Sequence, residues 1–245
     1  MIVKIKHPLV IDISLWEPLI YWEKLEPRPD GVIMKASQNN FIDPSVKQHC
    51  SDLSTRTYKR GLYHFLVQDD IAKQVKTYLD LCREVGALDG DTWLFEFPPV
   101  LDVEVKYTIS REKAAGQVKA WLDAVESATH RKPMIYTSQN FWNNYICSLL
   151  LFQTIPPKWT SDYPLWVAQY YNNPDLHDEP APLPMGWTDW VGWQYYDAYV
   201  FPNNAIPFNG CDVNVFKREY LDAIENLHPR GSKMIMDGIN YTEQT

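Results

Sequence analysis

Two carboxylates interrupt an apolar stretch near the middle of the chain, FPPVLDVEV at residues 97–105. Asp102 and Glu104 are two residues apart, so in an extended strand their side chains leave the same face. Burying two neighbouring ionised carboxylates is costly. Each carboxylate also raises the pKa of the other, which helps the pair to keep one proton at neutral pH. This pattern indicates acid–base chemistry.

Two kinds of hydrolysis use clustered carboxylates, one assisted by a divalent metal ion and one directed at glycosidic bonds. Metal sites usually recruit histidines or a dense cage of oxygen ligands. Tyr, Trp and Gln are the residues expected near this pair, and His64 is interpreted as a hydrogen-bonded core histidine. In glycosidases one carboxyl group protonates the leaving oxygen while another stays ionised. We therefore favour glycoside hydrolysis; the spacing also fits assistance by the sugar's own acetamido group and leaves retention or inversion open.

Eight short apolar runs predict the strands that position these residues. They are residues 8–14, 31–37, 61–67, 98–105, 132–138, 163–170, 190–196 and 211–216. Near-continuous apolar runs, rather than strict alternation, are typical of a sheet whose outer face is covered by helices.

Helical signals lie between the strands over the first two-thirds of the chain. Residues 43–54 offer Asp43 as an N-cap and Pro44 as the first helical residue. Ser110 is the candidate cap of a longer helix with one apolar stripe. Further helices are expected near residues 70–85, 140–150 and 214–226. Loops rich in Pro and Asn follow residue 170 and predict that the last strands connect without helices.

Eight strands and about five helices predict an α/β fold, an irregular TIM-like β/α barrel, with a doubly wound open sheet as the alternative. We expect one catalytic barrel domain over residues 1–228, and a C-terminal extension or the start of a linker over residues 229–245. Reactive groups of such barrels lie at the C-terminal ends of strands. The polar residues at those ends are Asp12, Lys35, Tyr63, His64, Asp102, Glu104, Tyr136, Gln169, Gln194 and Asp212. Four acids converging on one mouth predict a functional site.

Charge and composition exclude several classes of partner. The formal net charge of -8 disfavours nucleic acid, which wants a basic face, and electrostatic capture by an anionic membrane. No apolar run reaches membrane-spanning length, so we expect no membrane insertion. The four cysteines match no metal or redox spacing and are expected to be buried free thiols. The 10 Trp and 15 Tyr suit core packing and also stacking on sugar rings.

Eight stretches of the chain resemble the glycoside hydrolase family 25 lysozymes, the Chalaropsis-type N-acetylmuramidases, in the order in which that family carries them. The stretches are VIDISLW, GVIMKAS with FIDP, RGLYHFL, PVLDVEV, KPMIYTSQNFW, YPLWVAQY, WVGWQY and CDVNVF, from about residue 9 to 216. The resemblance implies a barrel of eight strands and five helices and no metal or organic cofactor. It also implies hydrolysis of the β-1,4 bond between N-acetylmuramic acid and N-acetylglucosamine, with peptidoglycan glycan strands as the partner.

The resemblance also assigns roles to individual residues. Glu104 would be the general acid, and Asp102 would orient the acetamido group or stabilise an oxazolinium-like charge. Asp12 and Asp212 would complete an acidic floor. The predicted substrate-binding residues are Tyr63, Tyr136, Lys35, Gln169, Trp193 and Gln194.

Two segments depart from the family pattern and bear on subsite preference. Residues 15–18 are Leu-Trp-Glu-Pro where the family usually has His-Trp-Gln-Gly, and residues 37–40 are Ser-Gln-Asn-Asn where it usually has a Thr-Glu-Gly segment. The second change removes a carboxylate at the rim. Two other hypotheses stay open: a carbohydrate-binding protein on a retired enzyme scaffold, and a glycosidase acting on chitin-like or host glycans.

The N-terminal residues carry no signal-peptide pattern. We expect the protein to be a monomer and, from the family resemblance, to act on the cell wall. Without a signal peptide it would reach the wall as a phage lysin released through a pore or by leaderless export. The remaining expectation is an extracellular mature form whose leader was removed.

Overall fold

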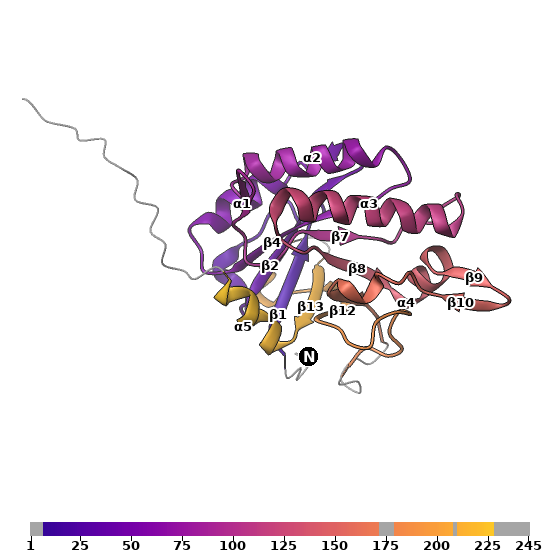
Figure 1. The fold of residues 1–245 in the computed structure, drawn as a ribbon. Coiled ribbons are helices and arrows are strands. Elements are labelled where there is room, and N and C mark those ends of the chain that lie inside the picture. The colour runs from indigo at the N-terminus through magenta and orange to yellow at the C-terminus, as the bar shows by residue number, and fades with distance from the viewer. Residues whose placement is uncertain (1–6, 172–178, 208–209, 228–245) are drawn as a thin grey trace, which may run out of the picture.

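Eight strands close into a barrel in the computed structural model, which describes residues 7–171, 179–207 and 210–227 (Figure 1). The predicted extension at 229–245 lies outside the described residues. In order around the barrel the strands are β1 (Leu9–Ile13), β2 (Gly31–Gln38), β4 (Lys59–Phe65), β7 (Val100–Asp102), β8 (Met134–Ser138), β11 (Leu165–Ala168), β12 (Gly192–Tyr199) and β13 (Cys211–Phe216). Because β1 pairs with both β2 and β13, the predicted barrel is confirmed and the open sheet is wrong.

The closing strand runs against its neighbours. Strands from β1 to β12 pair in parallel, whereas β13 is antiparallel to both β12 and β1. Asp212 therefore stands at the N-terminal end of its strand, and its predicted placement at a C-terminal end was wrong. The reversed direction still brings it to the rim where the other strands end, directly opposite Asp12 in the ladder.

Five α-helices occur in the described residues, and α1, α2, α3 and α5 pack outside the barrel (Figure 1). They are α1 (Val46–Ser54), α2 (Ile71–Glu84), α3 (Arg111–Thr129), α4 (Gln139–Phe141) and α5 (Arg218–Asn226). Ser110 caps α3 as predicted, since its side chain accepts a hydrogen bond from the backbone N–H of Lys113. The helix predicted to start at residue 214 starts later, because β13 occupies that segment.

Asp43 does not cap α1, and that prediction was wrong. The helix begins at Val46, and Asp43 Oδ1 accepts from the backbone N–H and the hydroxyl of Ser45 at 2.9 and 2.6 Å. Asp43 Oδ2 accepts from the backbone N–H of Leu15 at 3.0 Å. The carboxylate thus ties the turn before α1 to the loop after β1, close to the barrel mouth.

The helix predicted near 140–150 is replaced by the short helix α4, a turn of π-helix and a β-hairpin. After α4 come a turn of π-helix, η2 (Trp142–Ile146), and a hairpin of β9 (Ser148–Leu150) and β10 (Gln153–Ile155) that projects from the barrel (Figure 1). The hairpin turn holds Leu151 and Phe152 at φ 48° and 66°, a left-handed conformation that normally selects Asn-Gly. Their side chains are 84% and 100% exposed.

Smaller elements complete the described chain. They are the strands β3 (Phe41–Ile42), β5 (Leu88–Asp89) and β6 (Thr92–Trp93) and the 3-10 turns η1 (Trp22–Lys24), η3 (Thr160–Asp162) and η5 (Pro202–Asn204). Between β12 and β13 the described residues 200–207 and 210 contain η5 and no α-helix, in line with the prediction. None of the helices in the described ranges has the length and apolarity needed to cross a bilayer.

Alternation along the strands sorts side chains between two cores. Residues facing the barrel interior include Val10, Ile33, Trp166 and Phe216, which pack beneath the mouth. His64 faces the helices instead, stacked on Trp121 with ring centroids 5.6 Å apart. Its ring nitrogens lie 2.8 Å from Ser37 Oγ and 3.2 Å from Gln74 Oε1, and burial lowers its pKa to about 4. It is the neutral core histidine that the sequence predicted, and all four cysteines are free and buried as expected.

Candidate active site

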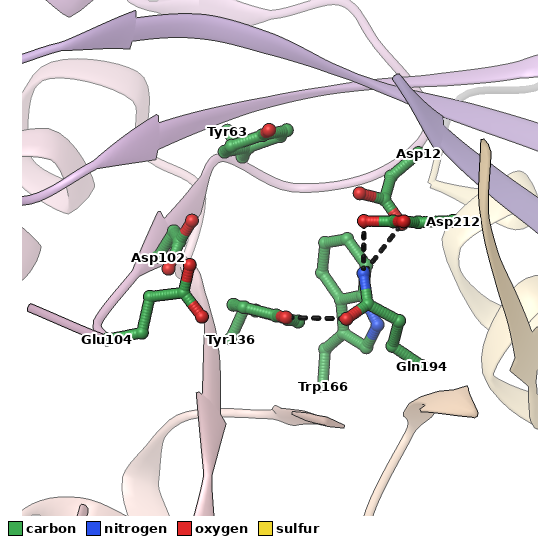
Figure 2. Close-up of a pocket in the computed structure, with 8 residues that line it drawn as sticks. All are labelled: Asp12, Tyr63, Asp102, Glu104, Tyr136, Trp166, Gln194 and Asp212. Atoms are coloured by element: carbon green, nitrogen blue, oxygen red, sulfur yellow. Dashed lines mark hydrogen bonds between the residues drawn. The ribbon is translucent and has the colours of Figure 1, made fainter. Parts of the chain in front are cut away.

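The mouth of the barrel holds an inner cavity lined by polar and aromatic side chains (Figure 2). Its lining residues are Asp12, Tyr63, Asp102, Glu104, Tyr136, Trp166, Gln194 and Asp212. An adjoining outer cavity shares the four acids and Tyr63. It is extended by Ile13, Ser14, Trp16, Glu17, Lys35, Phe65, Asp197 and Gly210. Together the two cavities form one groove, which we call the active-site groove.

Asp102 and Glu104 form one wall of the groove, with their carboxyl groups side by side (Figure 2). Asp102 ends β7 and is buried, whereas Glu104 is exposed at the mouth. Burial, and then the charge of Glu104, raise the pKa of Asp102 well above its usual range. Burial, and then the charge of Asp12, raise that of Glu104, while Lys35 opposes both shifts. Both shifts favour retention of a proton by the pair, and Asp102 Oδ1 is a buried atom with no hydrogen-bond partner among the described residues.

Asp12 and Asp212 form the opposite wall. Asp12 Oδ2 accepts from Gln194 Nε2 at 3.0 Å and from Asn214 Nδ2 at 2.7 Å, and Gln194 Nε2 also lies 3.2 Å from Asp212 Oδ2. Burial raises the pKa of Asp12 to about 6, opposed by the two amide donors. Burial and the charge of Asp12 raise the pKa of Asp212 to about 9. At neutral pH Asp12 is thus mainly ionised and Asp212 protonated.

The structure brings most of the predicted binding residues to the groove. Tyr63, Tyr136 and Gln194 line the inner cavity, and the Tyr136 hydroxyl donates to Gln194 Oε1 at 2.6 Å. Lys35 lines the outer cavity; its Nζ donates to Gln38 Oε1 at 2.8 Å and lies 4.8 Å from the centre of the Phe65 ring.

Trp193 and Gln169 line neither cavity. Trp193 is buried outside the barrel interior, because it alternates along β12 with the inward-facing Gln194. Its indole N–H donates to the backbone carbonyl of Gln169 at 2.7 Å. This pair holds the strand end that carries Gln194.

Several residues in or behind the groove are absent from the predicted site residues. Trp166 lines the inner cavity, and Trp16, Glu17 and Asp197 line the outer one. Asn214 and Tyr170 line neither cavity and hydrogen-bond Trp166 and Gln194, which line the inner one. The two-residue period of a strand could have found Asn214, which shares a face with Asp212. Glu17 is buried; its Oε2 accepts from the backbone N–H of Ser14 at 2.9 Å, and burial raises its pKa to about 7.

The arrangement supplies proton donors and fixed negative charge around one space. Each wall carries a carboxyl group able to hold a proton beside one able to stay ionised. Such a pairing can protonate a leaving oxygen and stabilise positive charge on a sugar. Within the described part of the chain, no group of three or more His, Cys, Asp or Glu side chains is placed to hold a metal ion.

Comparison with known proteins gives consistent matches. The family model Glycosyl hydrolases family 25 matches residues 11–204. The uncharacterized protein YegX of Escherichia coli K12 is 28% identical over 240 residues, 95% of this chain and 74% of that protein. The N,O-diacetylmuramidase of Chalaropsis sp. is 25% identical over 217 residues, 84% of this chain and 96% of that protein. The crystal structure of a bacterial lysozyme from Streptomyces coelicolor has a TM-score of 0.72 at 21% identity, covering 91% of this chain and 99% of that one.

Proposed function

Because the chain belongs to the glycosyl hydrolases of family 25, we propose that it is a lysozyme that cleaves the β-1,4 bond between N-acetylmuramic acid and N-acetylglucosamine in peptidoglycan. The observation that carries the proposal is the arrangement of two facing pairs of carboxyl groups around one cavity, Asp102 with Glu104 and Asp12 with Asp212, all with raised pKa values. The similarity to a Chalaropsis N,O-diacetylmuramidase supports the choice of substrate.

Glu104 is the proton donor in this proposal. It is the exposed member of its pair, so it can reach the oxygen of the scissile bond while Asp102 stays beneath the sugar. As the bond from the anomeric carbon to that oxygen breaks, the oxygen takes the proton from Glu104. Burial and the charge of Asp12 raise the pKa of Glu104, which favours retention of that proton.

Asp102 assists the attacking group. The acetamido oxygen of the muramic acid residue attacks the anomeric carbon, and Asp102 orients the acetamido N–H and balances the positive charge of the cyclic intermediate. Water then opens that intermediate, and the Glu104 carboxylate takes up the water's proton. Tyr63 and Tyr136 lie between the two walls in the inner cavity and contact the reacting sugar in this scheme (Figure 2).

The Glu104→Gln variant tests the assignment. Gln keeps the shape of the side chain but has no proton of suitable acidity, so we expect a loss of about 10²-fold or more in the rate of reducing-end release from purified peptidoglycan. Muropeptide analysis of the wild-type digest should show new reducing-end muramic acid. Glu112→Gln, at an exposed position of α3 outside the groove, is the matched control. Full activity of Glu104→Gln, or reducing-end glucosamine, would contradict the proposal, and binding without turnover by the wild type would indicate a retired scaffold.

The proposed place of action is the cell wall, with the protein acting as a monomer. Light scattering of the purified chain measures the oligomeric state directly. A stable dimer would contradict this part of the proposal and leave the chemistry untouched.

A further inference from the structure

Buried amides, rather than cations, contact the Asp12 carboxylate. Asn214 is fully buried and donates from Nδ2 to Asp12 Oδ2 at 2.7 Å and to the Val10 carbonyl at 3.2 Å. Its Oδ1 accepts from the indole N–H of Trp166 at 2.9 Å. Because an indole nitrogen can only donate, the orientation of the Asn214 amide is fixed, with its N–H groups toward Asp12.

The second amide is oriented in the same way. Gln194 Oε1 accepts from the hydroxyls of Tyr136 and Tyr170, which leaves Nε2 to face the acids. Asp12 Oδ2 thus accepts from two amide nitrogens, whereas Asp212 Oδ2 accepts from one of these nitrogens at the longer distance of 3.2 Å. A carboxylate that accepts several N–H groups is stabilised in its charged form.

We propose that Asn214 is a positioning residue for the reaction: it holds Asp12 in place and ionised, so that Asp12 rather than Asp212 presents the standing negative charge to the reacting sugar. The inference rests on the proposed function and deepens it. Asn214 lines neither cavity, so it acts on the sugar only through the lining residues that it contacts, Asp12 and Trp166.

Other charged groups around Asp12 do not account for its ionisation. The titratable and charged groups near it are Glu17 and Asp43 beside β1, Lys35 on β2, Tyr63 on β4, Asp102 and Glu104 at β7, Tyr136 on β8, Tyr170 after β11, Asp197 on β12, and Cys211 and Asp212 on β13. The ionised carboxylates in this set disfavour a charge on Asp12, whereas a hydrogen bond with the Asp212 carboxyl group favours it. Lys35 is the cation of the set, and its hydrogen bond goes to Gln38. The amide donors of Asn214 and Gln194 are the largest of the effects that oppose burial at Asp12, ahead of a backbone hydrogen bond and the hydrogen bond with Asp212.

The Asn214→Asp variant tests this role with little change of shape. An acceptor for the Trp166 indole remains, but the N–H donors are lost and a second carboxyl group meets Asp12, so a proton stays on that pair to higher pH. We expect the acid limb of the kcat profile to move up by about one pH unit or more, a loss on the order of 10-fold at pH 5, with KM little changed. Asn140→Asp, exposed and outside both cavities, should leave the profile in place.

Two further measurements make the outcome decisive. Asn214→Ser keeps one donor at shorter reach, should shift the limb in the same direction by less, and carries the test if Asn214→Asp does not fold. Titration of the Asp12 carboxyl carbon by NMR reports its ionisation even if the wild type releases no reducing ends from peptidoglycan, a result that would refute the proposed function alone. An unmoved acid limb and an unmoved Asp12 titration in a folded variant would overturn the positioning role.

Discussion

Glu17 provides a test of how much stability one buried carboxyl group costs this fold. Its side chain is only 8% exposed and lies in the loop after β1, where it accepts hydrogen bonds from the backbone N–H and hydroxyl of Ser14 at 2.9 and 3.4 Å. Burial is the main cause of its raised pKa, with added repulsion from Asp12 and Asp43. Glu17→Gln keeps an oxygen for the Ser14 donors and removes the charge.

The size and sign of the effect follow from the shift. The pKa rises from its ordinary value of 4.5 to about 7 on folding, which at 1.36 kcal/mol per unit corresponds to about 3 kcal/mol. Below pH 4.5 both the folded and the unfolded chain hold the proton, so the group costs nothing. Between pH 4.5 and 7 the unfolded chain releases its proton first, and stability is lost as the pH rises. Above pH 7 the full cost is present.

The assay is urea unfolding of the wild type and Glu17→Gln at pH 4.5 and pH 8. We expect nearly equal free energies of unfolding at the acidic pH, and a variant more stable than the wild type by most of this amount at pH 8. Glu23→Gln, at an exposed position of the neighbouring η1 turn, should track the wild type at both values. If Glu17→Gln is less stable than the wild type by the same margin at both pH values, the buried charge of Glu17 does not lower the free energy of unfolding, and the reasoning is refuted.

Two further substitutions test backbone and packing. Replacing Leu151 and Phe152 together by Asn and Gly relieves two left-handed residues at the hairpin turn; we expect a gain of about 1 kcal/mol in the free energy of unfolding and unchanged lysis of walls, and a loss of stability would contradict the assignment of strain. Gly192→Ala places a Cβ 2.5 Å from the Phe216 ring, so thermal and urea unfolding should show a loss of about 1–3 kcal/mol. Gly116→Ala, in open space on α3, should instead gain up to about 1 kcal/mol, and equal behaviour of the two alanines would refute the packing argument.

The barrel and its acids could be predicted because their signals are local. Apolar runs marked all eight strands, and the two-residue spacing of Asp102 and Glu104 placed both on the cavity side. The chain direction of the last strand carries no such signal, so the strand end of Asp212 was predicted wrongly although its place at the mouth is right. The cap of α1 failed for a related reason: Asp43 is recruited by Leu15, a partner 28 residues away.

The hairpin and the groove walls show the same limit. An apolar run of three Leu and a Phe suits a helix as well as a strand, and only the turn at Leu151 and Phe152 distinguishes them. Trp193 and Gln194 are neighbours in sequence but face opposite sides of β12, so a resemblance that covers both positions does not say which one faces the sugar. Register, which long-range pairing sets, decides that question.

The pairing of β1 with β13 also has a consequence for biosynthesis. Asp12 accepts a hydrogen bond from Asn214, 202 residues further along the chain, and the six other strands of the barrel are made in between. A nascent chain therefore carries Glu104, the proposed general acid, long before it carries the closing strand, and it has no complete groove until that strand leaves the ribosome. Closure over such a distance is an entropically late event in folding. In a time course of translation, catalytic activity should therefore appear only after β13 has been completed, and later than the synthesis of Glu104.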